Sequence, residues 1–550
     1  MDNNLNDQTS NNDQVSQNQS SLIKGSVWMT AGSIFSRILG AIYIIPWNNW
    51  FGTLLTAKLA NSLFAKGYNI YSLFLIISTA GIPGAISKQI AHYNAKNEYA
   101  AGNKLFRHGL KIMSFTGIVT AALMFFLAPW ISAGNKNLIP VLQALSFALL
   151  IIPIMSIMRG YFQGYNQMAP SAISQFVEQV ARVIYMLAAT YIIMKILKGS
   201  YVNAVVQSTF AAFIGAIFGL GILIIYLLYK LPILKKLSRG SKQIDIDTGN
   251  LTKEIWSQAL PFIILDSGII IFQLFDQYTF NWMMGTFSNY SQQTLDAMYA
   301  LFGFNANKLI MIVVSLASAM AVAAVPLLSA AHARHNKSEL NSQDGNTIQL
   351  FLFVMIPAAL GMYAVAEPLY ILFYRYDGLG ILMLQFSSIV AILLGLFTVV
   401  SAMLQGLYQN QKAINYFVIG FVVKMLLQYP AIYFLKEFGP LAATAAGMIV
   451  SSYLMLRLLY KKFGFNMNQT INRFSGIVII SIIMLLVIMV INYFGYQYIS
   501  VDNRVMSVAL LIVEVIVGIA IYGYLTLKIH LAEKILGSRV KALRIKLGIK

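Results

Sequence analysis

The chain has 550 residues, of which 58% are hydrophobic and only 11% are charged, against roughly a quarter in an ordinary soluble domain. This composition excludes a set of soluble domains. The long apolar runs exclude an outer-membrane barrel, whose strands of about ten residues alternate apolar and polar side chains. The 39 Lys and Arg residues exceed the 19 Asp and Glu residues, which is typical of loops facing anionic lipid and gives no reason to expect a nucleic-acid partner. The composition therefore predicts an all-α polytopic membrane protein. The lack of cysteine excludes disulfides and Cys-ligated metals, and we expect no cofactor and no metal site.

The first 21 residues are rich in Asn, Gln, Ser and Asp and do not resemble a cleavable signal peptide, so residues 1–21 are predicted to form a disordered cytoplasmic tail. Beyond them, apolar stretches long enough to span a membrane as helices recur along the chain. The fourteen predicted spans are 23–46, 62–92, 105–132, 139–164, 171–196, 201–229, 253–283, 306–333, 347–373, 380–408, 413–435, 440–461, 472–495 and 504–527.

Basic residues gather in the loops that follow even-numbered spans. Because loops rich in Lys and Arg stay in the cytoplasm, these loops and both termini are predicted to be cytoplasmic, in a bacterial cell membrane. Residues 529–550 interleave apolar and basic positions, a pattern shared by a basic amphipathic helix on the membrane surface and a solvated basic tail.

An internal repeat relates two parts of the chain. Gln163-Gly164 and Gln405-Gly406 are 242 positions apart, and the same offset relates Arg182 to Lys424. The repeat predicts two six-span lobes, 22–230 and 253–462, joined by a basic linker at 231–252 and followed by two further spans within 463–528. Since six is even, the lobes enter the membrane in the same orientation, as in transporters that rock two lobes around a central site.

Polar residues within the first span share one helical face. Ser26, Thr30, Ser33 and Arg37 follow helical spacing, so they are predicted to line a cavity. The alternative is helix–helix packing through the hydroxyl residues, with Arg37 reaching an interface.

Span two contains a predicted hinge at Gly81, Pro83 and Gly84, and Pro326 occupies the related position in span eight. Lys88 follows the first break and is predicted either to line the cavity or to reach the membrane interface as an end-of-helix lysine.

Charged residues also lie inside later spans. Glu178 and Arg182 are four residues apart, which allows them to pair, and Glu178 is also a candidate structural link between helices. Taken together, the cations predicted inside the spans outnumber the carboxylates. The cations are Arg37, Lys88, Arg159, Arg182, Lys308 and Lys424, and the carboxylates are Glu178, Asp266 and Asp276. Because Arg and Lys both bind phosphate oxygens, a cationic cavity favours a phosphate-bearing substrate.

Several motifs carry a family resemblance. Residues 36–40 (SRILG), 81–88 (GIPGAISK) and 159–164 (RGYFQG), with Lys308-Leu309 leading to Pro326, resemble the polysaccharide-transport branch of the MOP flippase superfamily. Within it, the likeness is to Gram-positive lipid II flippases of the MurJ type and to spore-cortex proteins, and it covers about residues 23–465.

The resemblance implies a V-shaped, MATE-like pair of lobes that exports an undecaprenyl-pyrophosphate-linked saccharide by alternating access. Arg37 and Lys308 match basic residues of the family motif. Tyr43 stands where many Gram-negative members have a second arginine. The family's third arginine, in span two, has no clear match here, and Lys88 is only a basic residue near that position.

Three alternatives remain beside a lipid II flippase. A MATE-type drug or cation antiporter shares the fold but favours an acidic, aromatic cavity. An exporter of another lipid-linked polysaccharide unit has the same sequence features. A membrane glycosyltransferase or acyltransferase needs a carboxylate or histidine cluster that the sequence does not supply, so we expect a transporter and not an enzyme. Either a coupling cation or the membrane potential is expected to drive transport.

Overall fold

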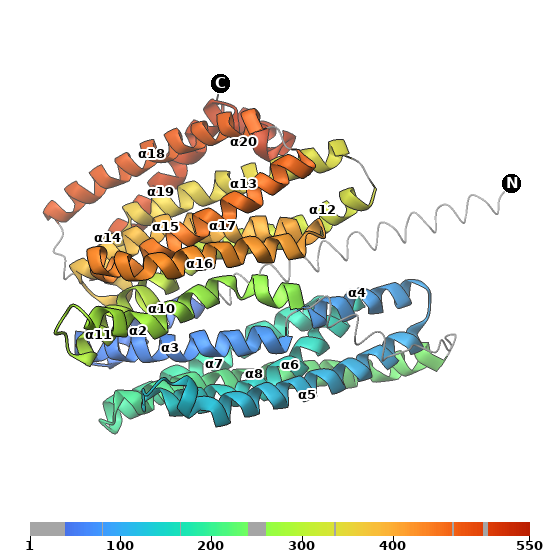
Figure 1. The fold of residues 1–550 in the computed structure, drawn as a ribbon. Helices are drawn as coiled ribbons and strands as arrows, with labels where there is room; N and C mark the ends of the chain where they lie inside the picture. Colours follow the sequence, from blue (N-terminus) through green and yellow to red (C-terminus); the bar gives the residue numbers. More distant parts are fainter. Residues whose placement is uncertain are drawn as a thin grey trace. The chain divides into compact units, whose positions relative to one another are not determined.

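The computed structural model describes residues 39–79, 81–165, 167–239, 260–334, 337–464, 467–498 and 504–549 (Figure 1). Within these ranges all regular elements are helices and no strand is present. A helix satisfies its own backbone hydrogen bonds, which a bilayer cannot do, so apolar segments of this length fold as helices. The predicted all-α class is confirmed.

The number of membrane spans differs from the sequence prediction. Ten helical stretches in the described residues are long and apolar enough to cross a membrane, or eleven with the bent pair Leu260–Asp266 and Gly268–Gly285, which meet at 54°. The predicted fourteen is therefore not confirmed. Span one lies largely outside the described residues, and the stretch Asn410–Phe463 counts once although it contains two helices.

The first of two compact units comprises residues 1–50 and 67–263. Its helices pack as neighbours, with α5 against α6, α6 against α8 and α7 against α8. The described elements are α2 (Ile44–Trp50), the later part of α3 (Leu54–Thr79), α4 (Ile82–Ala95), α5 (Tyr99–Ile131), α6 (Leu138–Gly164), α7 (Ala169–Tyr191), η1 (Ile192–Ile196) and α8 (Tyr201–Arg239).

The second unit comprises residues 51–66 and 264–550, so α3 begins in this unit and ends in the first. Its remaining described elements are α10 (Gly268–Gly285), α11 (Gln292–Ala300), η2 (Leu301–Ala306), α12 (Asn307–Ala333), α13 (Lys337–Ala364), α14 (Ala366–Tyr374), α15 (Gly378–Gly406), α16 (Asn410–Leu435), η3 (Lys436–Phe438), α17 (Gly439–Phe463), α18 (Met467–Tyr498), α19 (Arg504–Lys528), α20 (Leu531–Leu536) and α21 (Ser538–Lys546).

The backbone conformation differs between the two predicted hinge positions. Near Gly81, α3 ends at Thr79 and α4 begins at Ile82, with Gly81 at a φ of 73° and Pro83 in the first turn of α4. Proline suits a first helical turn, and glycine tolerates positive φ. Pro326, in contrast, lies inside the continuous helix α12. The predicted break in span two is therefore a real helix boundary, whereas its counterpart is not.

Each of a pair of repeat-related glycines packs closely against an earlier helix of its own unit. A Cβ added to Gly164 of α6 would lie 2.9 Å from the Ser87 carbonyl oxygen of α4, and one added to Gly406 of α15 would lie 3.0 Å from the Val325 carbonyl oxygen of α12. Both sites require a residue without a side chain. The two glycines therefore pack against α4 and α12 at positions about one helical turn apart, because the offset of 242 relates Ser87 to residue 329 and not to Val325.

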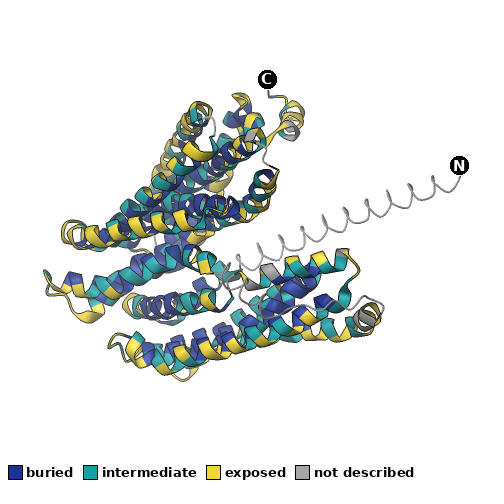
Figure 2. Ribbon diagram, turned by 45° about the vertical axis from the view of Figure 1, so that its right-hand side comes forward, coloured by how far each residue is buried: buried dark blue, intermediate teal, exposed yellow. Residues whose placement is uncertain are grey.

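The outer faces of the helices are strongly apolar. Figure 2 shows buried surfaces facing neighbouring helices and exposed ones on the opposite sides. Large side chains such as Trp130 (76% exposed) and Phe434 (77%) lie on these outer faces. In water such patches would be unstable, but hydrocarbon solvates them, which agrees with a membrane-spanning chain.

Helices α18 and α19 belong to the second unit but lie outside the predicted repeat, and we call them the accessory helices. They pack on α13 and α14 through apolar contacts. One cluster joins Phe353 and Ile356 of α13 to Ile477 of α18 and Leu527 of α19. The Tyr522 hydroxyl of α19 also donates to the Phe353 carbonyl oxygen at 2.8 Å. These contacts fix the accessory helices to one unit.

Candidate functional site

An ion pair joins α6 and α7 in the first unit. Arg159 Nη2 lies 2.8 Å from Glu178 Oε2 and 2.9 Å from Ser174 Oγ. The Ser174 hydroxyl in turn donates to the Gly219 carbonyl oxygen of α8 at 3.0 Å. The sequence spacing had suggested that Glu178 pairs with Arg182 on its own helix. The structure instead pairs Glu178 with the neighbouring helix, which makes it a link within the bundle.

Arg182 of α7 interacts with α3 and not with Glu178. Its guanidinium donates a hydrogen bond to the Tyr68 hydroxyl and lies 5.3 Å from the centre of that ring. Both a phenol and an aromatic face are neutral partners, so these contacts orient the guanidinium without cancelling its charge. Arg182 is only partly buried. This cation therefore retains the capacity to bind an anion.

Lys424, the sequence counterpart of Arg182, lies in a closed environment in the second unit. Its Nζ is 2.8 Å from Asp276 Oδ1 of α10 and 2.5 Å from Thr444 Oγ1 of α17, and the side chain is 0% exposed. Gln428 Nε2 also donates to Asp276 Oδ1 at 2.7 Å. Lys424 was predicted to bind substrate. In this structure it is inaccessible, because Asp276 and the surrounding helices neutralise and enclose its ammonium group.

Lys308 lies at the start of α12, directly after the π-helical turn η2. Its Nζ is 5.4 Å from the centre of the Phe64 ring and 5.6 Å from that of Phe304, and the residue is partly buried. Single π-helical turns recur at functional sites because they displace side chains from the regular helix positions. The local backbone thus presents Lys308 against aromatic faces.

Sequence reasoning missed two ion pairs that hold the start of α3 within the second unit. Lys58 Nζ lies 2.5 Å from Asp377 Oδ2, and Lys66 Nζ lies 2.5 Å from Asp296 Oδ1. The predicted span 62–92 contains Lys66 but leaves out Lys58. The structure starts α3 at Leu54, which puts both lysines on the helix.

A second missed contact involves η2. Asn305 lies in this turn, is buried, accepts from Asn61 Nδ2 at 2.8 Å and donates to the Tyr370 hydroxyl at 2.7 Å. Neutral amides carry no charge signal in the sequence, and a π-helical turn has no clear sequence pattern.

The remaining predicted site residues are dispersed. Lys88 is exposed on α4, and Asp266 is exposed at the bend before α10. The hinge residues Gly81, Pro83 and Gly84 lie at the α3–α4 boundary, and Pro326 lies inside α12. The four polar positions of span one, Ser26, Thr30, Ser33 and Arg37, lie outside the described residues.

The clusters are suited to binding a charged ligand. Among the residues that the structure describes, no group of three or more His, Asp or Glu side chains is placed to hold a metal ion. Independently of this, the guanidinium of Arg182 and the ammonium of Lys308 are groups that can bind an anion.

Comparison with known proteins places the chain in a family. Residues 22–332 match the family described as Polysaccharide biosynthesis protein. The chain belongs to this family. A curated relative, the lipid II flippase MurJ of Bacillus subtilis (strain 168), is 34% identical over 95% of this chain and 98% of the relative.

Solved structures share the fold. The structure of a lipid II flippase MurJ in an inward closed conformation matches with a TM-score of 0.61 and 14% identity, covering 91% of this chain and 98% of that one. An inward-facing multidrug resistance MATE family transporter of the MOP superfamily matches with a TM-score of 0.55 and 14% identity, over 80% and 98% of the two chains. The predicted MOP superfamily resemblance is confirmed, and the chain is a multi-pass bacterial membrane protein.

Proposed function

We propose that the protein is a flippase that moves a polyprenyl-pyrophosphate-linked saccharide, most directly lipid II, from the inner to the outer leaflet of the cell membrane. The observation that carries this proposal is the 34% identity to a lipid II flippase over nearly the full length of both chains. Because the alignment with this relative covers 95% of the chain, it includes the accessory helices α18 and α19. The function is transport, and it requires no catalytic residue.

Arg182 in the first unit and Lys308 in the second unit are each a described candidate for contact with a pyrophosphate. Both are partly buried, and both lie within 6 Å of the centre of an aromatic ring. A guanidinium offers paired donors to phosphate oxygens, and an ammonium acts as a point charge. Arg37, matched by the family motif, and Lys88 complete the proposed set. Lys424 is left out because Asp276 already pairs with it.

Alternating access is the proposed mechanism, with both termini on the cytoplasmic side. The basic loops support this orientation, because positively charged loops remain in the cytoplasm. The membrane potential, or a coupled cation, is proposed to supply the driving force, since about 2.3 kcal/mol is available per charge for each 100 mV.

Growth rescue tests the proposal. A bacterium depleted of its own lipid II flippase should grow when it produces this chain. Failure to rescue by protein that is present in the membrane, together with a gain of resistance to cationic drugs, would favour the MATE-type antiporter instead.

Cysteine labelling tests the orientation separately. The chain has no cysteine, so a single Lys236→Cys, exposed near the end of α8, provides a unique thiol. A membrane-impermeant reagent should label it in inverted vesicles and not in intact cells. The opposite pattern would reverse the proposed topology.

A further inference from the structure

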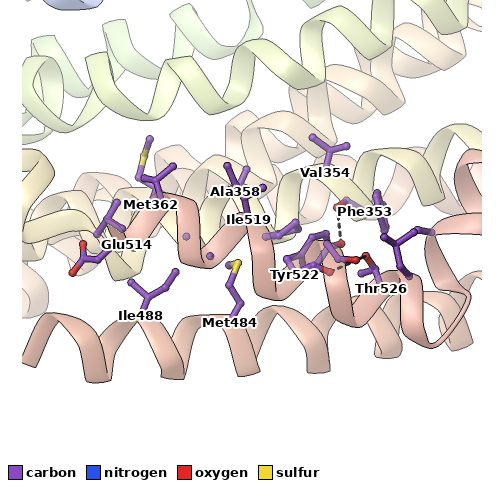
Figure 3. A pocket seen from close by; sticks show the side chains of 18 of the residues that line it. Phe353, Val354, Ala358, Met362, Met484, Ile488, Glu514, Ile519, Tyr522 and Thr526 are labelled. Carbon is purple, nitrogen blue, oxygen red and sulfur yellow. Dashed lines mark hydrogen bonds between the residues drawn. The ribbon is translucent and has the colours of Figure 1, made fainter. Parts of the chain in front are cut away.

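Polar side chains gather at one end of the groove that lies between α13, α14 and the accessory helices. Most of the groove is apolar, and Ala358, Met484 and Ile519 are typical of its lining (Figure 3). Glu514 of α19 is a charged member of this lining. Figure 3 shows its carboxylate at the far end of the groove from Thr526. A carboxylate inside a membrane-spanning helix is costly unless something compensates its charge.

Glu514 is completely buried. Its side chain is 0% exposed, and neither carboxylate oxygen has a hydrogen-bond partner within the ranges that the structure describes. Asp276 is also buried, but the Lys424 ammonium lies 2.8 Å from it and balances its charge. The carboxylate of Glu514 therefore needs a counter-charge that the described side chains do not supply.

Two hydroxyl groups close to Glu514 are also buried without hydrogen-bond partners. They are Tyr496 Oη of α18 and Ser507 Oγ of α19. Ser507 precedes Glu514 by seven residues, which is about two helical turns, so both lie on one face of α19. The Tyr496 hydroxyl is close enough to interact electrostatically with both of them. Since buried polar atoms are nearly always satisfied, this concentration of unpartnered oxygen atoms indicates a ligand.

Asn492 of α18 and Glu367 of α14 lie at the edge of this group. Asn492 Nδ2 donates to the Ala364 carbonyl oxygen at 3.4 Å, which leaves its amide oxygen as an acceptor beside Glu514. Glu367 lies in the first turn of α14, is partly buried and interacts electrostatically with Glu514 and Tyr496. Three helices thus contribute two carboxylates and several neutral oxygen atoms to one place.

This set of oxygen atoms suits a divalent cation. Ligands that are about 2.3–2.6 Å from a shared calcium ion lie roughly 3–5 Å from one another, so they need not be hydrogen-bonded together. A bound water would satisfy the oxygen atoms but would leave both carboxylates uncompensated. A divalent cation balances the two charges. Calcium accepts irregular sets of oxygen ligands, whereas magnesium demands a nearly ideal octahedron.

We propose that Glu514, Tyr496 and Ser507, with Asn492 and Glu367 at the edge, form a calcium site between α14 and the accessory helices. A bound ion would fasten both accessory helices to α14. All five residues belong to the second unit. The site is separate from the proposed transport site, and it depends on neither the substrate nor the orientation proposed above.

The dependence of stability on calcium tests the proposal. The full-length protein, in an uncharged detergent, is freed of metal ions with a chelator, and its unfolding temperature is measured as calcium is added. An ion that binds only the folded state raises this temperature progressively once its concentration exceeds the dissociation constant. We expect such a rise for the wild type with calcium, and little rise with magnesium or sodium at the same ionic strength.

Glu514→Gln keeps the size of the side chain and removes its charge. Without calcium this variant should unfold at a higher temperature than the wild type, because the uncompensated buried charge is gone. With calcium the order should reverse, since the affinity for calcium should fall by at least about tenfold. A packing defect would instead lower the temperature in both conditions. Glu437→Gln, which changes a partly exposed carboxylate in η3, is the control and should keep the calcium response.

Terbium luminescence locates the ion. Terbium replaces calcium at oxygen sites and emits when a nearby tyrosine is excited. Tyr496→Phe should remove most of the emission that calcium displaces, whereas Tyr493→Phe, at a position 67% exposed on the same helix, should keep it. Ser507→Ala removes one oxygen atom and should weaken calcium binding by about threefold to tenfold. These variants keep the test decisive even where Glu514→Gln fails to fold.

Three results would overturn the proposal. The first is a wild-type unfolding temperature that does not respond to calcium. The second is an equal rise with sodium, magnesium or acid pH in place of calcium, which would assign Glu514 to another cation or to a proton. The third is a calcium response that remains unchanged in the variants at positions 496, 507 and 514.

Discussion

Arg182 and Lys424 occupy equivalent positions of the internal repeat but have different surroundings. In the first unit Arg182 is partly buried and contacts the neutral Tyr68. In the second unit Lys424 is fully buried and paired with Asp276. The repeat has kept a cation at this helix position, while the neighbouring helices determine whether its charge is available. A substrate role therefore cannot be transferred between repeat halves by alignment alone.

The largest expected effect comes from breaking the enclosed pair. Asp276→Leu leaves the Lys424 ammonium buried without its counter-ion, which costs about 3–5 kcal/mol of folding free energy. The Asp276→Leu, Lys424→Met double variant should be more stable than Asp276→Leu, because it removes both buried charges. Thermal unfolding in detergent measures the difference. Lys436→Met, at an exposed position after the same helix, is the control; a double variant no more stable than Asp276→Leu would contradict the pairing.

For Arg182 we expect a loss of transport with little change in stability, in contrast to the loss of stability expected for Asp276→Leu. Arg182→Ala should reduce transport at least tenfold, corresponding to about 1.4 kcal/mol, because a charged contact to the pyrophosphate is lost. Its thermal stability should change little. Arg182→Lys should keep part of the activity, since charge remains without the paired donors. Growth rescue and unfolding temperature are measured together, with the exposed Lys195→Ala on the same helical segment as control. Normal rescue by Arg182→Ala would remove this residue from the site.

A substitution at the helix boundary between α3 and α4 is expected to lower the folding stability more than a substitution at Pro326 in α12. Gly81→Ala places a side chain at a φ of 73° and should cost about 1–2 kcal/mol. Gly84→Ala is the matched control, because an added Cβ there has no other heavy atom within 4 Å. Pro326→Ala should be nearly neutral.

Spin labels on either side of each position extend this comparison to motion. If the first unit bends at the boundary, distances across residues 79–82 should change when a membrane potential or lipid-linked substrate is supplied, and those across Pro326 should stay constant. Constant distances at both positions would identify the boundary as a static bend.

The smallest effect is expected for the pair between α6 and α7. Glu178→Gln keeps an oxygen that accepts from Arg159, and Ser174 continues to bind the same guanidinium. The loss should be below about 1.5 kcal/mol. Combining it with Arg159→Met in a double-mutant cycle gives the coupling energy. A loss as large as that of Asp276→Leu would mean that the two clusters are equally buried.

The sequence predicted the helical class and the break near Gly81, because apolar length and Gly-Pro chemistry are local signals, and the repeat stays a prediction. It did not predict the partners of the buried charges. The i, i+4 spacing suggested Glu178 with Arg182, whereas packing between helices pairs Glu178 with Arg159. The enclosure of Lys424 and the contacts of Asn305 depend on helices far apart in the chain, and no pattern within one span contains that information.

Lys424 also gives the second unit a natural reporter of its own opening. Acylating reagents modify an unprotonated, solvent-accessible amine, and this side chain is 0% exposed. Its modification must therefore wait for a fluctuation that separates α10, α16 and α17, as amide exchange waits for local unfolding. Mass spectrometry of the peptide containing residue 424, followed over hours, would give the free energy of that opening without any introduced label. Exposed lysines such as Lys436 would react at once and set the reference rate.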